Sequence, residues 1–357
     1  MKILLVDVDS KIPNLALMKL SNHYKTKGDT VNLTKVGLGY YPSKSKKEII
    51  VDATGYDKVL VSIIFHTNKK MVKIINCTDI EFGGVGYSLQ KNLDPAIESL
   101  EPDYTIYPDN DTSYGFITRG CIRNCPFCVV PKKEGMIKLN DTISNIVKHN
   151  KVKFLDNNIL AYKDHIKVFK ELKEKKIKFQ FNQGLDIRLL TDEISKLLSE
   201  CKTQGDIFFA FDNIRLLSLI KTKYAMFRQY NAAWKAKFFI YCNKDMPLNE
   251  VIPRITWCKD NEALPYLMRD INCWTSENKR FYCDLAAWCN QPSIFKKYTF
   301  PELMKVRIKN KDIIKKHIGL YEANWNGLEK NWNKKNFINP PYSKGLKAKF
   351  ISLTGGE

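Results

Sequence analysis

The chain has 357 residues, of which 44% are hydrophobic and 12% aromatic, so it is long enough for two folded domains and too apolar for a disordered or fibrous protein. No apolar run approaches the 18 residues of a membrane span, and the start, MKILLVDVDS, lacks a signal-sequence cleavage site, so we expect a cytoplasmic protein without membrane contact. A net charge of +20 favours polyanionic partners such as nucleic acid. Lysine greatly outnumbers arginine, however, which an AT-rich genome would also produce, so the charge leaves both interpretations open.

The first hundred residues alternate between strand and helix signals. Apolar runs at 2–8 (KILLVDV) and 56–65 (YDKVLVSIIF) are typical of buried strands, and the segment 13–23 between them has the apolar spacing of a helix. A glycine-rich turn follows at 81–89 (EFGGVGYSL). This alternation predicts a doubly wound α/β domain with a parallel sheet over residues 1–105, followed by a linker rich in proline and acids.

A second alternation begins at Tyr114, with Asp164 and Thr191 placed to begin helices. It predicts a partial or full β/α barrel of six strands over 106–295, with working residues at the carboxyl ends of the strands. Residues 296–357 form a basic extension that contains aromatic residues; from 296 to 350 it carries 14 lysines and arginines against 4 acids. The six strand signals are YGFIT (114–118), KVKFLDNNIL (151–160), IKFQFNQGLDIRLL (177–190), DIFFAFDN (206–213), KFFIYCN (237–243) and ALPYLM (263–268).

Three of the ten cysteines crowd into one loop, as Cys121, Cys125 and Cys128. A reducing cytosol makes a disulfide framework unfavourable, so metal or cluster ligation is the leading use of such a group. Three thiolates are one short of the four that close a structural zinc site or an ordinary cubane cluster, which leaves a coordination position open. Zinc with a distant fourth ligand is the main alternative.

The segment GCIRNCPFC, with Phe127 before its third cysteine, resembles the signature of radical S-adenosylmethionine enzymes, and the resemblance extends over about 110–290. It implies that the three cysteines hold a [4Fe–4S] cluster whose fourth iron binds S-adenosylmethionine. In that family the reduced cluster cleaves this cosubstrate to methionine and a 5′-deoxyadenosyl radical, which abstracts a substrate hydrogen. A reductant such as flavodoxin or ferredoxin would supply the electron.

The resemblance also suggests residues that bind the cosubstrate. FLDNNI ends the second strand where the family has a Gly-Gly-Glu or Asp-Asp-x-Phe sequence, but neither glycine nor glutamate is present here. In the third-strand segment an arginine could approach the cosubstrate carboxylate, or a nearby aspartate could hold that arginine instead; these residues could also merely cap the strand and start the next helix. Strand-end position alone makes Asp212 and Asn243 weaker candidates. The expected contacts are Phe127, Asp156, Asn157, Asn158, Gln183, Asp186, Arg188 and Asp212.

A doubly wound domain before the barrel resembles the cobalamin-binding branch of this family, with a flavodoxin-like topology. None of the five histidines lies in an Asp-x-His-x-x-Gly pattern, so we expect no cobalamin and a first domain that binds substrate or simply packs. A methylthiotransferase is not expected, because its first domain would add three cluster cysteines and this one has only Cys77. Cys258, Cys273, Cys283 and Cys289 could hold a second cluster, but their aromatic neighbours suit buried apolar cysteines better.

The extension contains Asn339-Pro340-Pro341-Tyr342, which resembles the catalytic tetrad of amino-directed DNA methyltransferases, and its context resembles the phage-type adenine-N6 enzymes. The resemblance covers only about 326–351 and lacks a glycine-rich cosubstrate loop, so it implies a fragment that contacts nucleic acid or a chance turn, and a phage or mobile-element origin. The alternatives to a radical enzyme are therefore a methyltransferase-related protein and a non-catalytic nucleic-acid-binding protein stabilised by a cluster or zinc.

Overall fold

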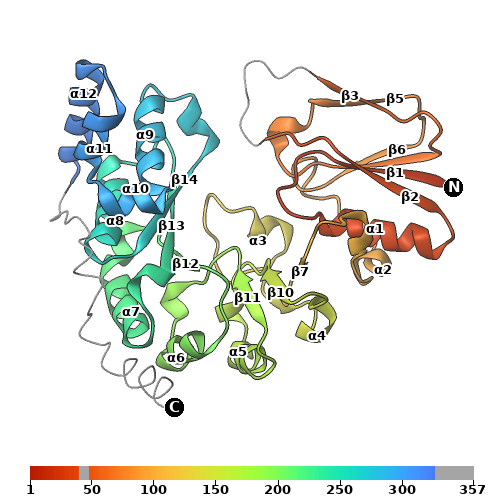
Figure 1. Cartoon of the computed structure of the whole chain (residues 1–357), viewed down its shortest axis with the longest axis horizontal. Coiled ribbons are helices and arrows are strands. Elements are labelled where there is room, and N and C mark those ends of the chain that lie inside the picture. Colours follow the sequence, from red (N-terminus) through yellow and green to blue (C-terminus); the bar gives the residue numbers. More distant parts are fainter. Residues whose placement is uncertain (40–47, 326–357) are drawn as a thin grey trace, which may run out of the picture. The chain divides into compact units, whose positions relative to one another are not determined.

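The computed structural model describes residues 1–39 and 48–325, which form a mixed α/β structure with mostly parallel sheets, as the sequence predicted (Figure 1). The chain divides into two compact units, Met1–Phe154 and Leu155–Glu357, called here the first and second units. The domain limits suggested near residues 105 and 295 stay a prediction. None of the described helices is long and apolar enough to cross a membrane.

The first unit is built on a four-stranded parallel sheet in the order β2-β1-β4-β6. Its strands are β1 (Lys2–Asp7), β2 (Thr30–Lys35), β4 (Lys58–Ser62) and β6 (Ile80–Gly83). Successive side chains of a strand point to opposite faces, so Ile3 and Leu5 pack with Leu17 of helix α1 (Leu15–Thr26), whereas Leu4 and Val6 enter a second apolar layer. Burial on both faces explains why β1 is continuously apolar.

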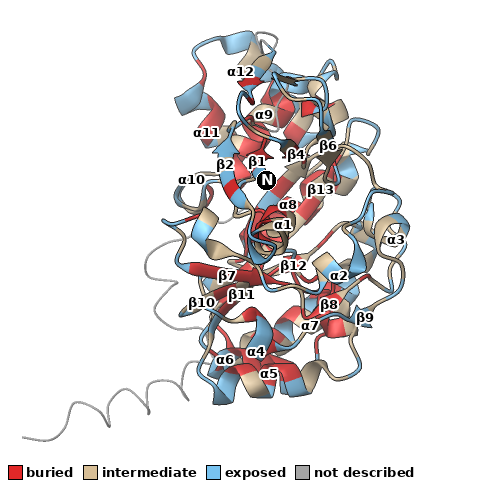
Figure 2. Ribbon diagram, turned by 90° about the vertical axis from the view of Figure 1, so that its right-hand side faces the viewer, coloured by how far each residue is buried: buried red, intermediate tan, exposed pale blue. Residues whose placement is uncertain are grey.

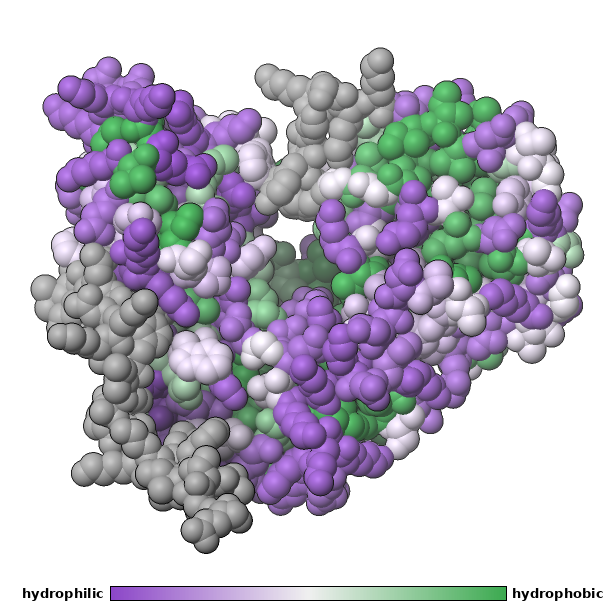
Figure 3. Space-filling view, viewed as in Figure 1, coloured by the Kyte–Doolittle hydropathy of each residue, from purple (hydrophilic) through white to green (hydrophobic). Residues whose placement is uncertain are grey.

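The second apolar layer comes from β3 (Ile49–Asp52) and β5 (Val72–Ile75), which pair in parallel on the face of the sheet opposite α1 (Figure 1). Ile50 of β3 is 60% exposed, and Figure 3 shows hydrophobic residues at the surface near these two strands. The expected linker contains a short helix, α2 (Pro95–Glu98), and a 3-10 turn at Tyr104–Ile106.

The rest of the first unit carries the three clustered cysteines. β7 (Thr112–Gly115), which is buried along its length in Figure 2, pairs in parallel with β10 (Lys151–Phe154). The chain between them makes a short antiparallel pair, β8 (Thr118–Arg119) with β9 (Lys138–Leu139). Two short helices complete this region: α3 (Val130–Lys133) between β8 and β9, and α4 (Ile143–Ile146) before β10.

The second unit alternates strands and helices, as expected, and its sheet β12-β13-β14 is parallel. Thr191 accepts a hydrogen bond from the Ile194 amide and begins α6, whereas Asp164 precedes α5 without a side-chain cap. In chain order the elements are α5 (His165–Glu174), β11 (Lys178–Phe181), α6 (Asp192–Glu200), β12 (Ile207–Ala210), α7 (Leu217–Tyr230), β13 (Ala236–Cys242), α8 (Leu248–Asp260), β14 (Leu264–Arg269), α9 (Lys279–Cys289), α10 (Pro292–Lys297), α11 (Phe300–Arg307) and α12 (Lys311–Glu322).

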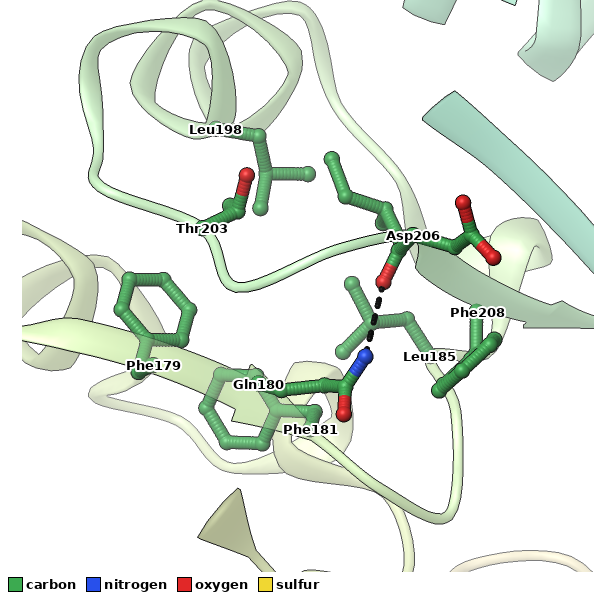
Figure 4. A pocket seen from close by; sticks show the side chains of 9 residues that line it. Phe179, Gln180, Phe181, Leu185, Leu198, Thr203, Asp206 and Phe208 are labelled. Carbon is green, nitrogen blue, oxygen red and sulfur yellow. Dashed lines mark hydrogen bonds between the residues drawn. The ribbon is translucent and has the colours of Figure 1, made fainter. Parts of the chain in front are cut away.

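The segment around β11 meets β12 only through isolated bridges, Phe179 with Thr203 and Leu185 with Phe209. Figure 4 shows the cavity that this incomplete pairing leaves, with apolar rings around one polar contact from the Gln180 amide to the Asp206 carbonyl, at 3.3 Å. The cavity volume is about 10 Å³, which holds at most one water molecule, so it is a packing defect rather than a binding site.

Candidate functional site

The cysteine loop, residues 120–135 between β8 and β9, is closed at its base by a backbone contact that requires glycine. Gly120 has φ +87°, and a Cβ there would lie 2.4 Å from the Met136 carbonyl oxygen. On the other side of this base the Cys121 amide donates to the Gly135 carbonyl at 3.1 Å. The first of the three cysteines, Cys121, therefore comes directly after a backbone position that is held in place by its close contacts.

Charged side chains hold the same loop from its second half. Glu134 accepts a hydrogen bond from the Gly120 amide at 2.9 Å and forms an ion pair with Arg119 at 3.0 Å. Lys133, at the end of α3, donates to the Leu89 carbonyl at 2.7 Å and to the Lys91 carbonyl at 3.0 Å. These contacts restrain the base of the loop. The tip of the loop, where Cys125 lies, is held instead by the turn between Cys125 and Cys128.

All three loop cysteines are partly exposed, and none forms a disulfide within the described residues. The Arg123 amide donates to Sγ of Cys121 at 3.3 Å, and the Cys128 amide donates to the Cys125 carbonyl at 3.0 Å. Within residues 1–39 and 48–325, no three His, Cys, Asp or Glu side chains are close enough to hold one metal ion. Three cysteines within eight residues are the number of ligands that would leave one iron of a [4Fe–4S] cluster open, but the structure does not gather their sulfurs around one point.

The surface of the loop and of β9 is unusually apolar. Phe127, expected to contact the cosubstrate, is 39% exposed, and four further large hydrophobic side chains in this stretch are also exposed. They are Ile122, Val129, Met136 and Leu139. Apolar surface beside reactive thiols suits a site that closes over a partly apolar ligand.

The residues expected to follow the second barrel strand begin the second unit. Asp156 is completely buried and Asn158 nearly so, whereas Asn157 is partly exposed. Asn158 precedes the 3-10 turn Ile159–Ala161, which leads towards α5. Of these three side chains, Asn157 is therefore the most accessible to solvent.

The sequence left three interpretations open at the end of β11, and the structure shows two of them together: Asp186 holds Arg188, and it also caps the 3-10 turn Ile187–Leu189. Nε and Nη2 of Arg188 donate to the two carboxylate oxygens of Asp186 at 2.6 and 2.9 Å, and the Arg188 amide donates to Oδ1 at 3.2 Å. This two-point ion pair fixes the plane of the guanidinium. Gln183 lies on the exposed turn before it, next to Gly184, whose φ is +87°.

Asp212 follows β12 at its carboxyl end. Its Oδ1 accepts a hydrogen bond from the Tyr241 amide at 2.9 Å. Burial raises the pKa of the Asp212 carboxyl, and the hydrogen bond from Tyr241 and the charges of Arg254 and Arg188 only partly oppose this. A carboxyl with a raised pKa among cations at a strand end is typical of a functional position.

Sequence reasoning missed Arg254, which lies on α8 and is completely buried. Its guanidinium donates to the Phe211 carbonyl at 2.8 Å and to the Tyr241 carbonyl at 3.0 Å, so it joins the carboxyl ends of β12 and β13. The signal was an arginine within the apolar stretch VIPRITW, because a buried charge requires several partners. Tyr241 was also missed; its hydroxyl donates to Asp270 at 2.9 Å, and burial raises the pKa of Tyr241 to about 12.

In the first unit, two carboxylates lie at the carboxyl end of β1 and just after it. Asp9 accepts hydrogen bonds from the amides of Ile64 and Phe65 and from the Asn68 side chain, at 2.8 to 3.0 Å. Asp7 accepts from the Tyr107 hydroxyl at 2.8 Å. The loops after β1 and β4 are thus bonded to each other by the protein's own anions.

The glycine-rich turn after β6 packs against the same region. A Cβ on Gly84 would lie 2.3 Å from the Ile63 carbonyl oxygen, and one on Gly86 would lie 2.6 Å from the Phe65 nitrogen. These glycines let two backbones touch. Close backbone packing therefore explains them without any bound cofactor.

The later cysteines behave as apolar residues. Cys258, Cys273 and Cys289 are buried, and Cys283 is partly exposed. Cys273 lies 4.0 Å from Cys242, sulfur to sulfur. This burial agrees with the interpretation of the group as core residues. Asn339, Pro340, Pro341 and Tyr342 lie outside the described residues.

Comparison with known proteins adds no relative to this picture. No protein-family model and no curated protein matches the chain.

Proposed function

We propose that the chain is a radical S-adenosylmethionine enzyme. The observation that carries the proposal is the cysteine loop: three partly exposed cysteines within eight residues, beginning at a loop base that only glycine permits. The parallel α/β context supports it, with β7 and β10 to β14 as the strands of a partial barrel after a doubly wound first domain and before a basic extension.

In this proposal Cys121, Cys125 and Cys128 hold a [4Fe–4S] cluster. When bound and reduced, for example by flavodoxin or ferredoxin, such a cluster cleaves S-adenosylmethionine and generates a 5′-deoxyadenosyl radical that abstracts hydrogen from a substrate. The Arg123 amide donates to the Cys121 sulfur and so holds this side chain near the base of the loop. Phe127, exposed next to Cys128, supplies an apolar contact to the cosubstrate.

The other residues that the resemblance assigns to S-adenosylmethionine follow β10, β11 and β12 in the chain. Asp186 holds Arg188 in a two-point ion pair, which is the alternative to a contact of Arg188 with the cosubstrate carboxylate, so this pair orients the turn after β11. Asp212 offers an acceptor at the end of β12, and Asn157 replaces the family's glutamate with a neutral amide. Gln183 lies on the exposed turn nearby, and Asp156 and Asn158 support the turn from within.

The first unit has a packing role in this proposal, and cobalamin is not required. The strand-end positions where a cofactor would sit in a doubly wound sheet are occupied by Asp7 and Asp9 with their hydrogen-bond partners. The close contact at Gly84 and Gly86 accounts for the glycine turn.

The test is anaerobic. The protein is reconstituted with iron and sulfide and reduced, S-adenosylmethionine is added, and 5′-deoxyadenosine is quantified. Cys121→Ala, Cys125→Ala and Cys128→Ala should each abolish the product, whereas Cys77→Ala, which removes another partly exposed thiol of the first unit, should leave it unchanged. An iron-loaded protein whose spectrum is unaltered by S-adenosylmethionine, and which forms no product, would refute the enzyme and favour a cluster that only stabilises the fold.

A further inference from the structure

Five exposed lysines crowd together on α11, on α12 and on the short connection between these helices. They are Lys305, Lys309, Lys311, Lys315 and Lys316, here called the lysine cluster, and Asp312 is the one acid among them. Within the described residues, none of the five forms an ion pair. The outer end of α12 is covered by hydrophilic residues in Figure 3.

The lysine cluster differs from another lysine-rich helix of the chain, α5, whose lysines are paired. Helix α5 and the residue after its end carry four lysines, and each lies within 3.0 Å of a carboxylate oxygen. The pairs are Lys167 with Asp164, Lys170 with Glu193, Lys173 with Glu200, and Lys175 with Glu171. The lysine cluster thus has the same density of positive charge as α5 without the carboxylates that neutralise it there.

The cluster is displayed on a rigid support. Arg307 and His317 both contact the buried carboxylate of Asp284 on α9, at 3.2 and 3.0 Å, which fixes α11 and α12 to that helix. Lys311 and Lys315 are four residues apart on α12 and therefore neighbours on its exposed face, where like charges repel. No partner in the described chain relieves that repulsion, but a polyanion would.

We propose that the lysine cluster binds the phosphate backbone of a nucleic acid. Lysine is a point charge suited to phosphates and carries little base readout, so the contact is independent of base sequence. An anionic bilayer fits less well, because a membrane-surface helix turns its apolar side outward. Here Leu303, Met304 and Tyr321 are buried, and Val306, 70% exposed, is the one large hydrophobic residue of α11 and α12 classed as exposed.

The test measures binding of the full-length protein to labelled DNA and RNA, single-stranded and duplex, over a range of salt concentrations. The cluster variant changes Lys309, Lys311, Lys315 and Lys316 to Gln. The matched control changes the four paired lysines near α5, Lys167, Lys170, Lys173 and Lys175, to Gln. Both variants lose the same formal charge and keep good helix formers, and thermal melting checks that each folds.

We expect the cluster variant to bind at least about tenfold more weakly at moderate salt, and its slope of log affinity against log salt on duplex to fall by about 3 to 4. The control should change far less. Equal losses in the two variants would overturn the proposal in favour of total charge, and unchanged binding by the cluster variant would overturn it outright. Selective loss of binding to anionic vesicles instead would reassign the surface to a membrane.

The binding measurement needs neither an iron–sulfur cluster nor S-adenosylmethionine, so it can succeed where the radical chemistry fails. If both hold, nucleic acid becomes the substrate class to test for hydrogen abstraction. The cluster variant should then lose turnover of a polynucleotide while keeping cleavage of S-adenosylmethionine without substrate.

Discussion

Replacing Arg254 by Met tests whether this arginine holds the strand ends of the second unit. The change preserves length and helix propensity but removes the donors to the carbonyls of Phe211 and Tyr241. It also removes a positive charge close to Asp212, whose pKa burial already raises. We therefore expect the ends of β12 and β13 to separate and Asp212 to become harder to ionise.

The magnitude follows from the bonds that are lost. A buried acceptor deprived of its donor costs about 1 to 3 kcal/mol, and Arg254 serves two strand-end carbonyls as well as that of Glu250 on its own helix. The buried methionine returns some apolar contact, so we expect the free energy of unfolding to fall by about 3 to 5 kcal/mol. The free energy of unfolding of a folded domain is only about 5 to 15 kcal/mol in total, so the expected change is large.

Urea unfolding followed by tryptophan fluorescence measures this loss. All six tryptophans follow Leu155, so the signal comes from the second unit alone. Arg254→Lys keeps the charge with fewer donors and should fall between wild type and Arg254→Met. Arg215→Met, at an exposed position, should stay within about 0.5 kcal/mol of wild type. A loss below about 1 kcal/mol for Arg254→Met would refute the assigned role.

Three further changes test other parts of the structure. Gly120→Ala should destabilise the cysteine loop by at least about 1 to 2 kcal/mol, because Gly120 has a positive φ and an added Cβ would lie against the Met136 carbonyl. It should also raise the reactivity of the loop thiols more than Gly135→Ala, whose added Cβ meets no atom within 4 Å; equal effects would contradict this. Asp212→Asn should stabilise the protein at pH 7, since the raised pKa disfavours the ionised form, and the gain should disappear below about pH 4, where the aspartate is neutral; a gain that persists there would refute this explanation. Burial lowers the pKa of His317 despite Asp284, so stability should be lost as pH falls below about 6.5, and His317→Gln should remove that loss in thermal melts; an unchanged pH profile would argue against it.

Periodic apolar patterns made the main strands and the α/β class predictable. The strand expected at 2–8 is β1, and all six strand signals after residue 113 correspond to strands of the structure. Burial drives these patterns, and it is encoded locally by runs such as KFFIYC. The exposed β2, whose sequence TVNLTK alternates weakly, was missed because only one of its residues is buried.

Long-range polar contacts could not be predicted in the same way. That Asp186 pairs with Arg188 was one of three interpretations compatible with the sequence, and the outcome depends on the turn geometry after β11. Arg254 lies 43 residues from Phe211, to whose carbonyl it donates, and no local pattern indicates that distance. Spacing within a loop was more informative, because Cys121, Cys125 and Cys128 bring their own neighbourhood with them.

The two units treat the carboxyl ends of parallel strands differently, and this difference indicates where chemistry is to be sought. In the first unit Asp9 uses both carboxylate oxygens to bond the loop after β4, so its strand-end anion is committed to holding the fold. In the second unit Asp212 uses only Oδ1 in a hydrogen bond, while burial and nearby cations make its ionisation sensitive to whatever approaches. A carboxyl whose raised pKa disfavours its ionised form is more often a binding residue than a structural one. Asp9→Asn should therefore lower stability, whereas Asp212→Asn, which we expect to raise stability, should weaken cosubstrate binding; a reversal of these effects would move the candidate site to the first unit.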